Sequence, residues 1–202
     1  MAEYLCALAR KSGRDALWYL EEANDHPVHA RPITQARKNG GQFVVACLSA
    51  WRQFSEKSAN TDVIHVLEGS AFQSTVRFIM EEELSGIEDY YTQFEEIISP
   101  LAARVVYLRP KDAIEHSRLT SLSRGDVWTG KVSNYLEKTA YSKSHGLVGT
   151  SGMHRFWAGY AVLCDRIVRK SALPAKTINV EMGEWERHNA EAADFFELEP
   201  GK

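Results

Sequence analysis

Apolar residues follow two patterns along the chain, one typical of short buried strands and one typical of helices. Four apolar runs have the length of strands that are covered on both faces, and they lie at residues 16–20, 63–67, 104–109 and 177–180. Between these runs, apolar residues recur every three or four positions, which predicts amphipathic helices. Strands that alternate with helices predict crossover connections and a mainly parallel sheet with helices on both faces. The expected fold class is therefore three-layer α/β.

The helical pattern covers more of the chain than the strand pattern does. Ser85-Gly86-Ile87-Glu88 resembles a capping box at the start of one helix, and Pro100 is expected to end that helix. Residues 142–152 are rich in Gly and Ser and predict a loop. The expected helices lie at residues 4–11, 43–54, 72–80, 85–99, 110–119, 128–136, 156–167 and 185–196.

Length and composition fit one globular domain over residues 1–202, with 44% apolar and 25% charged residues. A net charge of -3 argues against a polymer of nucleic acid as partner. The three cysteines are too widely spaced for a disulfide framework or a zinc knuckle, and Cys47 and Cys164 are expected in the core. Without an apolar leader or an apolar stretch of membrane-spanning length, we expect a cytoplasmic protein with no membrane partner.

Candidate chemistry is predicted at one edge of the sheet, because ligands of open parallel sheets bind beyond the carboxyl ends of the strands. Carboxylates there can orient a hydroxyl group or hold magnesium, and arginines can neutralise a phosphoryl group during transfer. Both residue types follow the predicted strands, so the pattern favours phosphoryl transfer. The residues concerned are Glu21 and His26 after the first strand, Glu68, Ser70 and Gln73 after the second, Arg109 at the end of the third, and Arg118 and Arg124 downstream.

Structural roles are the alternative for each of these positions. Glu21 could mark a solvated strand end, His26 a turn before Pro27, and the two downstream arginines an exposed helix and loop. His65 lies inside a strand and is expected to be a hydrogen-bonded interior residue. The aromatic residues between Phe43 and Phe54 are expected in the core.

The segment Val63-Ile64-His65-Val66-Leu67-Glu68-Gly69-Ser70 resembles a strand end of the P-loop nucleoside and nucleotide kinases. In the deoxynucleoside kinases of that group the strand ends in Glu-Arg-Ser. Glu68 and Ser70 match this motif, whereas Gly69 replaces the arginine. The resemblance implies an ATP- and Mg²⁺-dependent kinase acting on a small hydroxylated substrate, with Glu68 as catalytic base or metal-side carboxylate.

The resemblance also implies roles for the other candidates. Glu21 would face the substrate, as would Gln73 and Arg77 on the following helix, and we add His26 to this group. Residues 116–130 resemble a lid, whose Arg118 and Arg124 would grip the phosphates. Ser70 and Arg109 are assigned to the nucleotide side.

One element of that family is missing from the sequence. A phosphate-binding loop requires G-x-x-x-x-G-K-[ST], and no such run occurs in the chain. In the family this loop lies between the first strand and the first helix, whereas this sequence opens with a helix that has no capping residue before it. We therefore expect the first strand and the loop to be missing, and phosphotransfer to be impaired.

Three functions stay open at this point. The chain could be a kinase-like enzyme, a ligand-binding or regulatory module that kept the substrate pocket, or an interaction protein that uses only the scaffold. A sheet edge left uncovered would encourage pairing into a homodimer.

Overall fold

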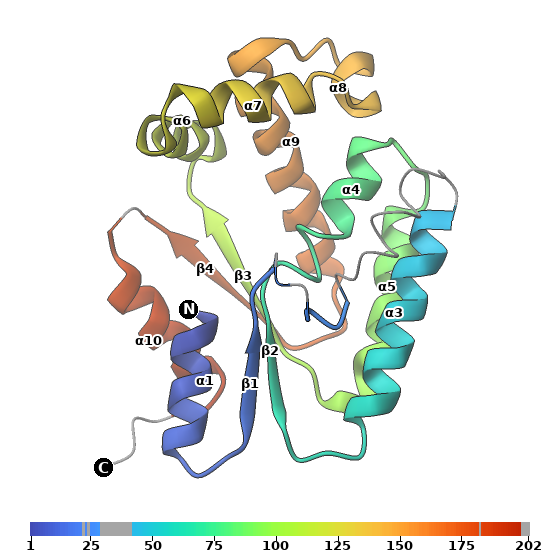
Figure 1. Ribbon diagram of the computed structural model, residues 1–202, viewed down its shortest axis with the longest axis vertical. Helices are drawn as coiled ribbons and strands as arrows, with labels where there is room; N and C mark the ends of the chain where they lie inside the picture. The colour runs from blue at the N-terminus through green and yellow to red at the C-terminus, as the bar shows by residue number, and fades with distance from the viewer. Residues whose placement is uncertain (22, 24, 29–41, 182, 199–202) are drawn as a thin grey trace.

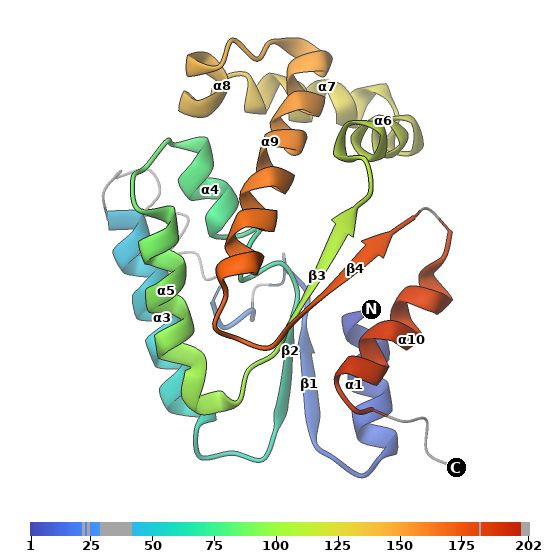
Figure 2. The same ribbon diagram turned by 180° about the vertical axis from the view of Figure 1, so that it is seen from behind.

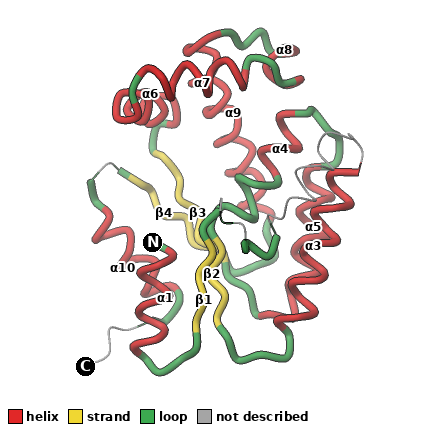
Figure 3. Tube along the Cα trace, in the orientation of Figure 1, coloured by secondary structure: helices red, strands yellow, loops and turns green. Residues whose placement is uncertain are grey.

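A computed structural model describes residues 1–21, 23, 25–28, 42–181 and 183–198 (Figure 1). Its strands are short and its helices account for most of the described chain (Figure 3). The helices are α1 (Ala2–Lys11), α3 (Phe43–Ser58), α4 (Val76–Glu81), α5 (Ile87–Ile98), α6 (Ala113–Arg124), α7 (Asp126–Leu136), α8 (Ala140–Ser144), α9 (Gly149–Lys170) and α10 (Trp185–Phe195), with a 3₁₀ turn, η2 (Ser99–Leu101).

The strands form two parallel ladders. Strand β1 (Ala16–Tyr19) pairs with β2 (Ile64–Leu67), and β3 (Val105–Pro110) pairs with β4 (Ala175–Val180). The four strands are thus found where the apolar runs predicted them, and their parallel direction is confirmed. The expected single sheet is not observed, since no ladder joins β2 to β3 within the described residues. Apolar runs locate strands, but lateral pairing depends on segments that are distant in sequence.

Helices cover the ladders from two sides, as Figures 1 and 2 show from opposite directions. Helices α1 and α10 lie on one side, where Leu5, Ala16, Ile178 and Ala192 belong to one buried apolar cluster. Val106 on β3 packs against the same cluster, so α1 and α10 cover both ladders. The helix–ladder–helix layering fits the expected α/β class.

The larger part of the core lies on the other side, among α3, α5 and α9. Trp51 packs against Phe94 with ring centroids 4.6 Å apart, and its indole N–H donates to the hydroxyl of Tyr90. The predicted core positions are confirmed, since Cys47 and Cys164 are both buried. None of the described helices is both long and apolar enough to cross a lipid bilayer.

Two local predictions differ from the structure. Ser85 does not cap α5, because the N-cap is Gly86 in a left-handed conformation, and no side-chain capping bond forms. The loop expected at 142–152 is confirmed only at 145–148, since α8 ends at Ser144 and α9 begins at Gly149. The segment that resembles a lid, 116–130, consists of the end of α6 and the start of α7, joined at Gly125, and its role as a lid stays a prediction.

Candidate functional site

The carboxyl ends of β1 and β2 lie side by side. The register pairs Tyr19 with Leu67, so both strands end at the same level. The ladder continues for one more bond, in which the backbone N–H of Glu68 donates to the carbonyl of Tyr19 at 3.1 Å. The residues that follow the two strands, Glu21 and Glu68, are therefore placed at a common edge, as the sequence predicted.

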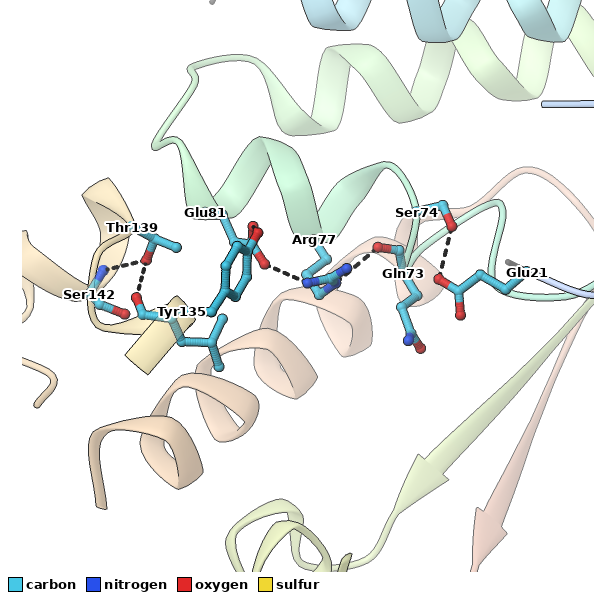
Figure 4. Close-up of polar contacts among 9 residues, drawn as sticks. Glu21, Gln73, Ser74, Arg77, Glu81, Tyr135, Thr139 and Ser142 are labelled. Carbon is cyan, nitrogen blue, oxygen red and sulfur yellow. Dashed lines mark hydrogen bonds and ion pairs between the residues drawn. The ribbon is translucent and has the colours of Figure 1, made fainter. Parts of the chain in front are cut away.

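Glu21 is held in this position by the turn that follows β2. The Ser74 hydroxyl donates to a carboxylate oxygen of Glu21 at 2.9 Å (Figure 4). The Ser74 backbone N–H donates to the carbonyl of Gly69, also at 2.9 Å, which closes the turn. The carboxylate of Glu21 thus has a fixed orientation rather than the freedom of a solvated strand end.

Gly69 has two reasons to be glycine. Its φ is +66°, a left-handed conformation that disfavours a side chain. A Cβ built there would also lie 2.6 Å from the Glu21 Cδ. An arginine at this position, as in the Glu-Arg-Ser motif, would therefore displace Glu21.

Glu68 is partly buried at the end of β2. Within the described part of the chain, its carboxylate takes part in no hydrogen bond or ion pair. The Glu21 side chain lies against Gly69, the residue directly after Glu68. The edge therefore combines the anchored carboxylate of Glu21 with the carboxylate of Glu68, which is available to a ligand. Ser70 lies next in the chain but is 4% exposed, so it lies behind this edge.

Arg77 and Gln73 lie beside the edge, but of these two only the Arg77 side chain is held by hydrogen bonds within the described residues. Gln73 is exposed, whereas the Arg77 guanidinium donates to the backbone carbonyl of Gln73 at 3.1 Å and to the Glu81 carboxylate at 2.5 Å (Figure 4). Glu81 is fully buried and also accepts a hydrogen bond from the Tyr135 hydroxyl. Glu81 therefore joins Arg77 on its own helix, α4, to Tyr135 on α7, a structural link that the sequence analysis missed.

His26 and His65 belong to a cluster of rings on the β1–β2 ladder. His26 is 2% exposed, and its Nδ1 accepts from the backbone N–H of Val28 at 3.2 Å. The Tyr19 hydroxyl lies 3.2 Å from Nδ1 of His65, which confirms the expected hydrogen bond, although His65 is half-buried rather than interior. Burial lowers the pKa of His65 and raises the pKa of Tyr19. Both shifts favour the neutral forms of Tyr19 and His65, so these two rings add no charge to the edge.

Arg109 is engaged at the end of β3. Its Nε donates to both carboxylate oxygens of Asp165 on α9, at 2.8 and 3.0 Å. This hydrogen bonding raises the pKa of the guanidinium, so Arg109 stays charged. The pair lines a hollow of about 300 Å³ together with Tyr107 and Thr177.

The two remaining arginines lie on α6. Arg118 pairs with Glu115 one turn earlier at 3.4 Å, and Arg124 is exposed on the last turn. Among the described residues, neither arginine forms a hydrogen bond or ion pair with Glu68. Asp112 caps this helix by accepting from two backbone N–H groups. The predicted role of Arg118 and Arg124 at the phosphates thus depends on a bound ligand that reaches both side chains.

Metal binding would also depend on a ligand. Across the described ranges, no group of three or more His, Cys, Asp or Glu side chains is arranged to hold a metal ion. Magnesium in phosphoryl-transfer sites is bound by one or two carboxylates together with substrate phosphates. Glu68 fits that requirement as a single carboxylate.

Comparisons with known proteins give no relative. No family model, no curated protein and no solved structure matches this chain. The chemistry of its own residues is therefore what supports a function.

Proposed function

We propose that the chain binds a small hydroxylated molecule at the carboxyl ends of β1 and β2. The observation that carries this proposal is the juxtaposition of Glu68, which has no partner within the described residues, with the Glu21 carboxylate anchored by Ser74. A carboxylate that takes part in no internal bond can accept a hydrogen bond from a ligand hydroxyl. Two carboxylates at one edge select a ligand rich in donors.

The same arrangement suits the acceptor side of a phosphotransferase that resembles the P-loop nucleoside and nucleotide kinases. Glu68 would accept the proton of the attacking hydroxyl, or bind Mg²⁺ together with phosphate oxygens. Glu21 would line the substrate side of the edge, and the exposed amide of Gln73 would add a contact. ATP would supply the phosphoryl group when bound.

The chain has fewer groups that could bind the phosphates in such a reaction. The 202 residues contain no G-x-x-x-x-G-K-[ST] run, and Arg109 already binds Asp165. Each preorganised charged contact to a transferring phosphoryl group contributes on the order of 2–4 kcal/mol. We therefore expect weak turnover from this chain, and substrate binding to be its more robust property.

A ligand-binding or regulatory module without catalysis is the second candidate. It is favoured by Gly69, because its contact with Glu21 leaves no room for the arginine of the Glu-Arg-Ser motif. Such a module would bind its ligand through the same edge and would not consume ATP.

Calorimetry on the whole chain separates these functions. Nucleosides, sugars and aminoglycoside antibiotics would be titrated into the wild type, with and without ATP and Mg²⁺. For a ligand that binds, Glu68→Gln should weaken affinity about tenfold, the value of a hydrogen bond to a charged group. Glu96→Gln, an exposed position on α5, is the matched control and should change nothing.

The outcomes are distinct. ATP consumption that depends on the ligand and on Glu68 supports the phosphotransferase, and ligand binding without ATP consumption supports the module. Failure of every compound to bind, or binding that Glu68→Gln leaves unchanged, overturns the assignment of this edge.

A further inference from the structure

A second hollow lies away from the strand ends, where α4, α5, α8 and α9 meet. It has a volume of about 500 Å³, and apolar side chains make up most of its lining. Four further residues complete the lining, and they supply two charged groups, one hydroxyl group and one glycine. These residues are Glu83, Tyr141, Gly159 and Arg166.

Glu83 supplies an acidic group at one end. Its backbone is in the left-handed region with φ +48°, a strained conformation for a residue with a side chain. Its carboxylate accepts a hydrogen bond from Ser144 and lies 3.7 Å from Nδ1 of His145. No Lys or Arg pairs with Glu83 in the described ranges, so the strained turn holds a carboxylate without a permanent counter-charge.

The other end has the opposite charge balance. Arg166 pairs with Glu88 at 2.9 Å, and Lys170 pairs with the same carboxylate at 2.6 Å. Two cations therefore share one anion at this end. A cationic ligand would be repelled from Arg166 and drawn to Glu83, which fixes its direction in the hollow.

Gly159 lets the Tyr141 hydroxyl approach the backbone of α9 between the two ends. A Cβ at this position would lie 2.6 Å from the Tyr141 hydroxyl and 3.5 Å from the Met80 methyl group. The Tyr141 hydroxyl, for its part, has no hydrogen-bond partner within the described residues. It can accept a hydrogen bond from a ligand, and its ring offers a face to a cation.

We propose that this hollow binds a small molecule with an apolar body and a cationic amine. The amine would contact Glu83 and Tyr141, and the body would cover Met80, Leu84 and Leu163. This site is separate from the strand-end site and does not depend on the function proposed there.

The test uses two probes with the same body, phenethylamine and 2-phenylethanol, titrated into the full chain and followed by NMR. The amine should bind at least about tenfold more tightly than the alcohol, since only the amine forms a charge-assisted bond. Glu83→Gln should remove most of that preference and leave the affinity for the alcohol unchanged. Glu96→Gln, an exposed acid on α5, should leave the affinities for both probes unchanged.

Gly159→Ala tests the space independently of charge. Alanine favours a helix over glycine, so the variant should fold at least as well as wild type unless Tyr141 resists displacement. Thermal unfolding checks this, and both probes should bind at least about fivefold more weakly because the Cβ would push the Tyr141 side chain into the hollow. Equal affinities of amine and alcohol for the wild type, no effect of Glu83→Gln, or no binding of either probe at millimolar concentration would each overturn the proposal.

Discussion

A Cβ at position 69 would lie 2.6 Å from the Cδ of Glu21, so the glycine after Glu68 and the acid after β1 occupy adjoining space. Because the φ of Gly69 is also positive, two effects oppose any side chain there. This contact links the ends of the two strands more closely than their four paired residues alone would do.

Gly69→Ala should destabilise the protein by about 2–4 kcal/mol, the sum of left-handed strain and steric overlap. Gly13→Ala is a matched control, since Gly13 has φ +79° and no atom within 4 Å of its Cβ position. The control should cost only about 1–2 kcal/mol. Urea unfolding of both variants measures the difference, and equal costs would show that the contact with Glu21 is unimportant.

The Arg77–Glu81 pair predicts a large effect of removing one charge. Glu81→Gln should destabilise by about 3–5 kcal/mol, because Arg77 is only 14% exposed and would keep its charge without a counterion. Tyr135→Phe removes one bond to the same carboxylate and should cost about 1–2 kcal/mol. Chemical denaturation measures both, with Glu96→Gln as the exposed control; a Glu81→Gln cost below that of Tyr135→Phe would contradict the buried pair.

Two glycines within helices should respond in opposite directions. Gly130→Ala on α7 meets no atom within 4 Å and should stabilise by about 0.5–1 kcal/mol through helix propensity. Gly152→Ala on α9 would place its Cβ 2.6 Å from the backbone carbon of Leu147 and should destabilise by about 1–3 kcal/mol. Thermal melting compares them, and stabilisation by both substitutions would mean that the approach of Leu147 to α9 is not as close as described.

His65 predicts a pH dependence of stability. Burial lowers its pKa in the folded state, so between the folded value and the ordinary value near 6.5 the unfolded chain binds more protons. The contribution of this residue is fully present above about pH 6.5 and is lost as the pH falls through the folded pKa. His65→Gln should therefore flatten the fall in unfolding free energy between pH 7.5 and 5.5, measured by urea titration. Identical slopes in the wild type and the variant would exclude this role.

The sequence predicted the elements of the fold better than their edges. Short apolar runs located the four strands, but the expected cover on both faces was wrong for β4, since four of its six residues are exposed. The predicted start of α5 was wrong, although Ser85 and Glu88 satisfy the capping pattern. In the structure Glu88 pairs with Lys170, a residue that is distant in sequence. The loop predicted from the Gly- and Ser-rich composition at 142–152 is shorter than expected, because α8 and α9 extend into it and leave only 145–148 outside helices.

For the candidate site, the sequence predicted the residues at the strand ends but not the residues that hold them in place. The rule for strand ends selected Glu21 and Glu68, and the structure places them at one edge. The partners Ser74, Glu81 and Asp165 were missed because each acts through a contact with a residue on another element. Asp112 could have been recognised as a helix cap, since an Asp directly before a helical pattern is the usual signal.

The two ladders also have a consequence for how the chain folds. Ala16 pairs with Ile64 and Val105 with Ala175, so the partners are separated by 64 − 16 = 48 and 175 − 105 = 70 positions. Helices such as α9 form from near neighbours, whereas these pairings must close long loops first, and high contact order slows folding. We expect kinetic intermediates of this chain to be rich in helix, with the strands joining last.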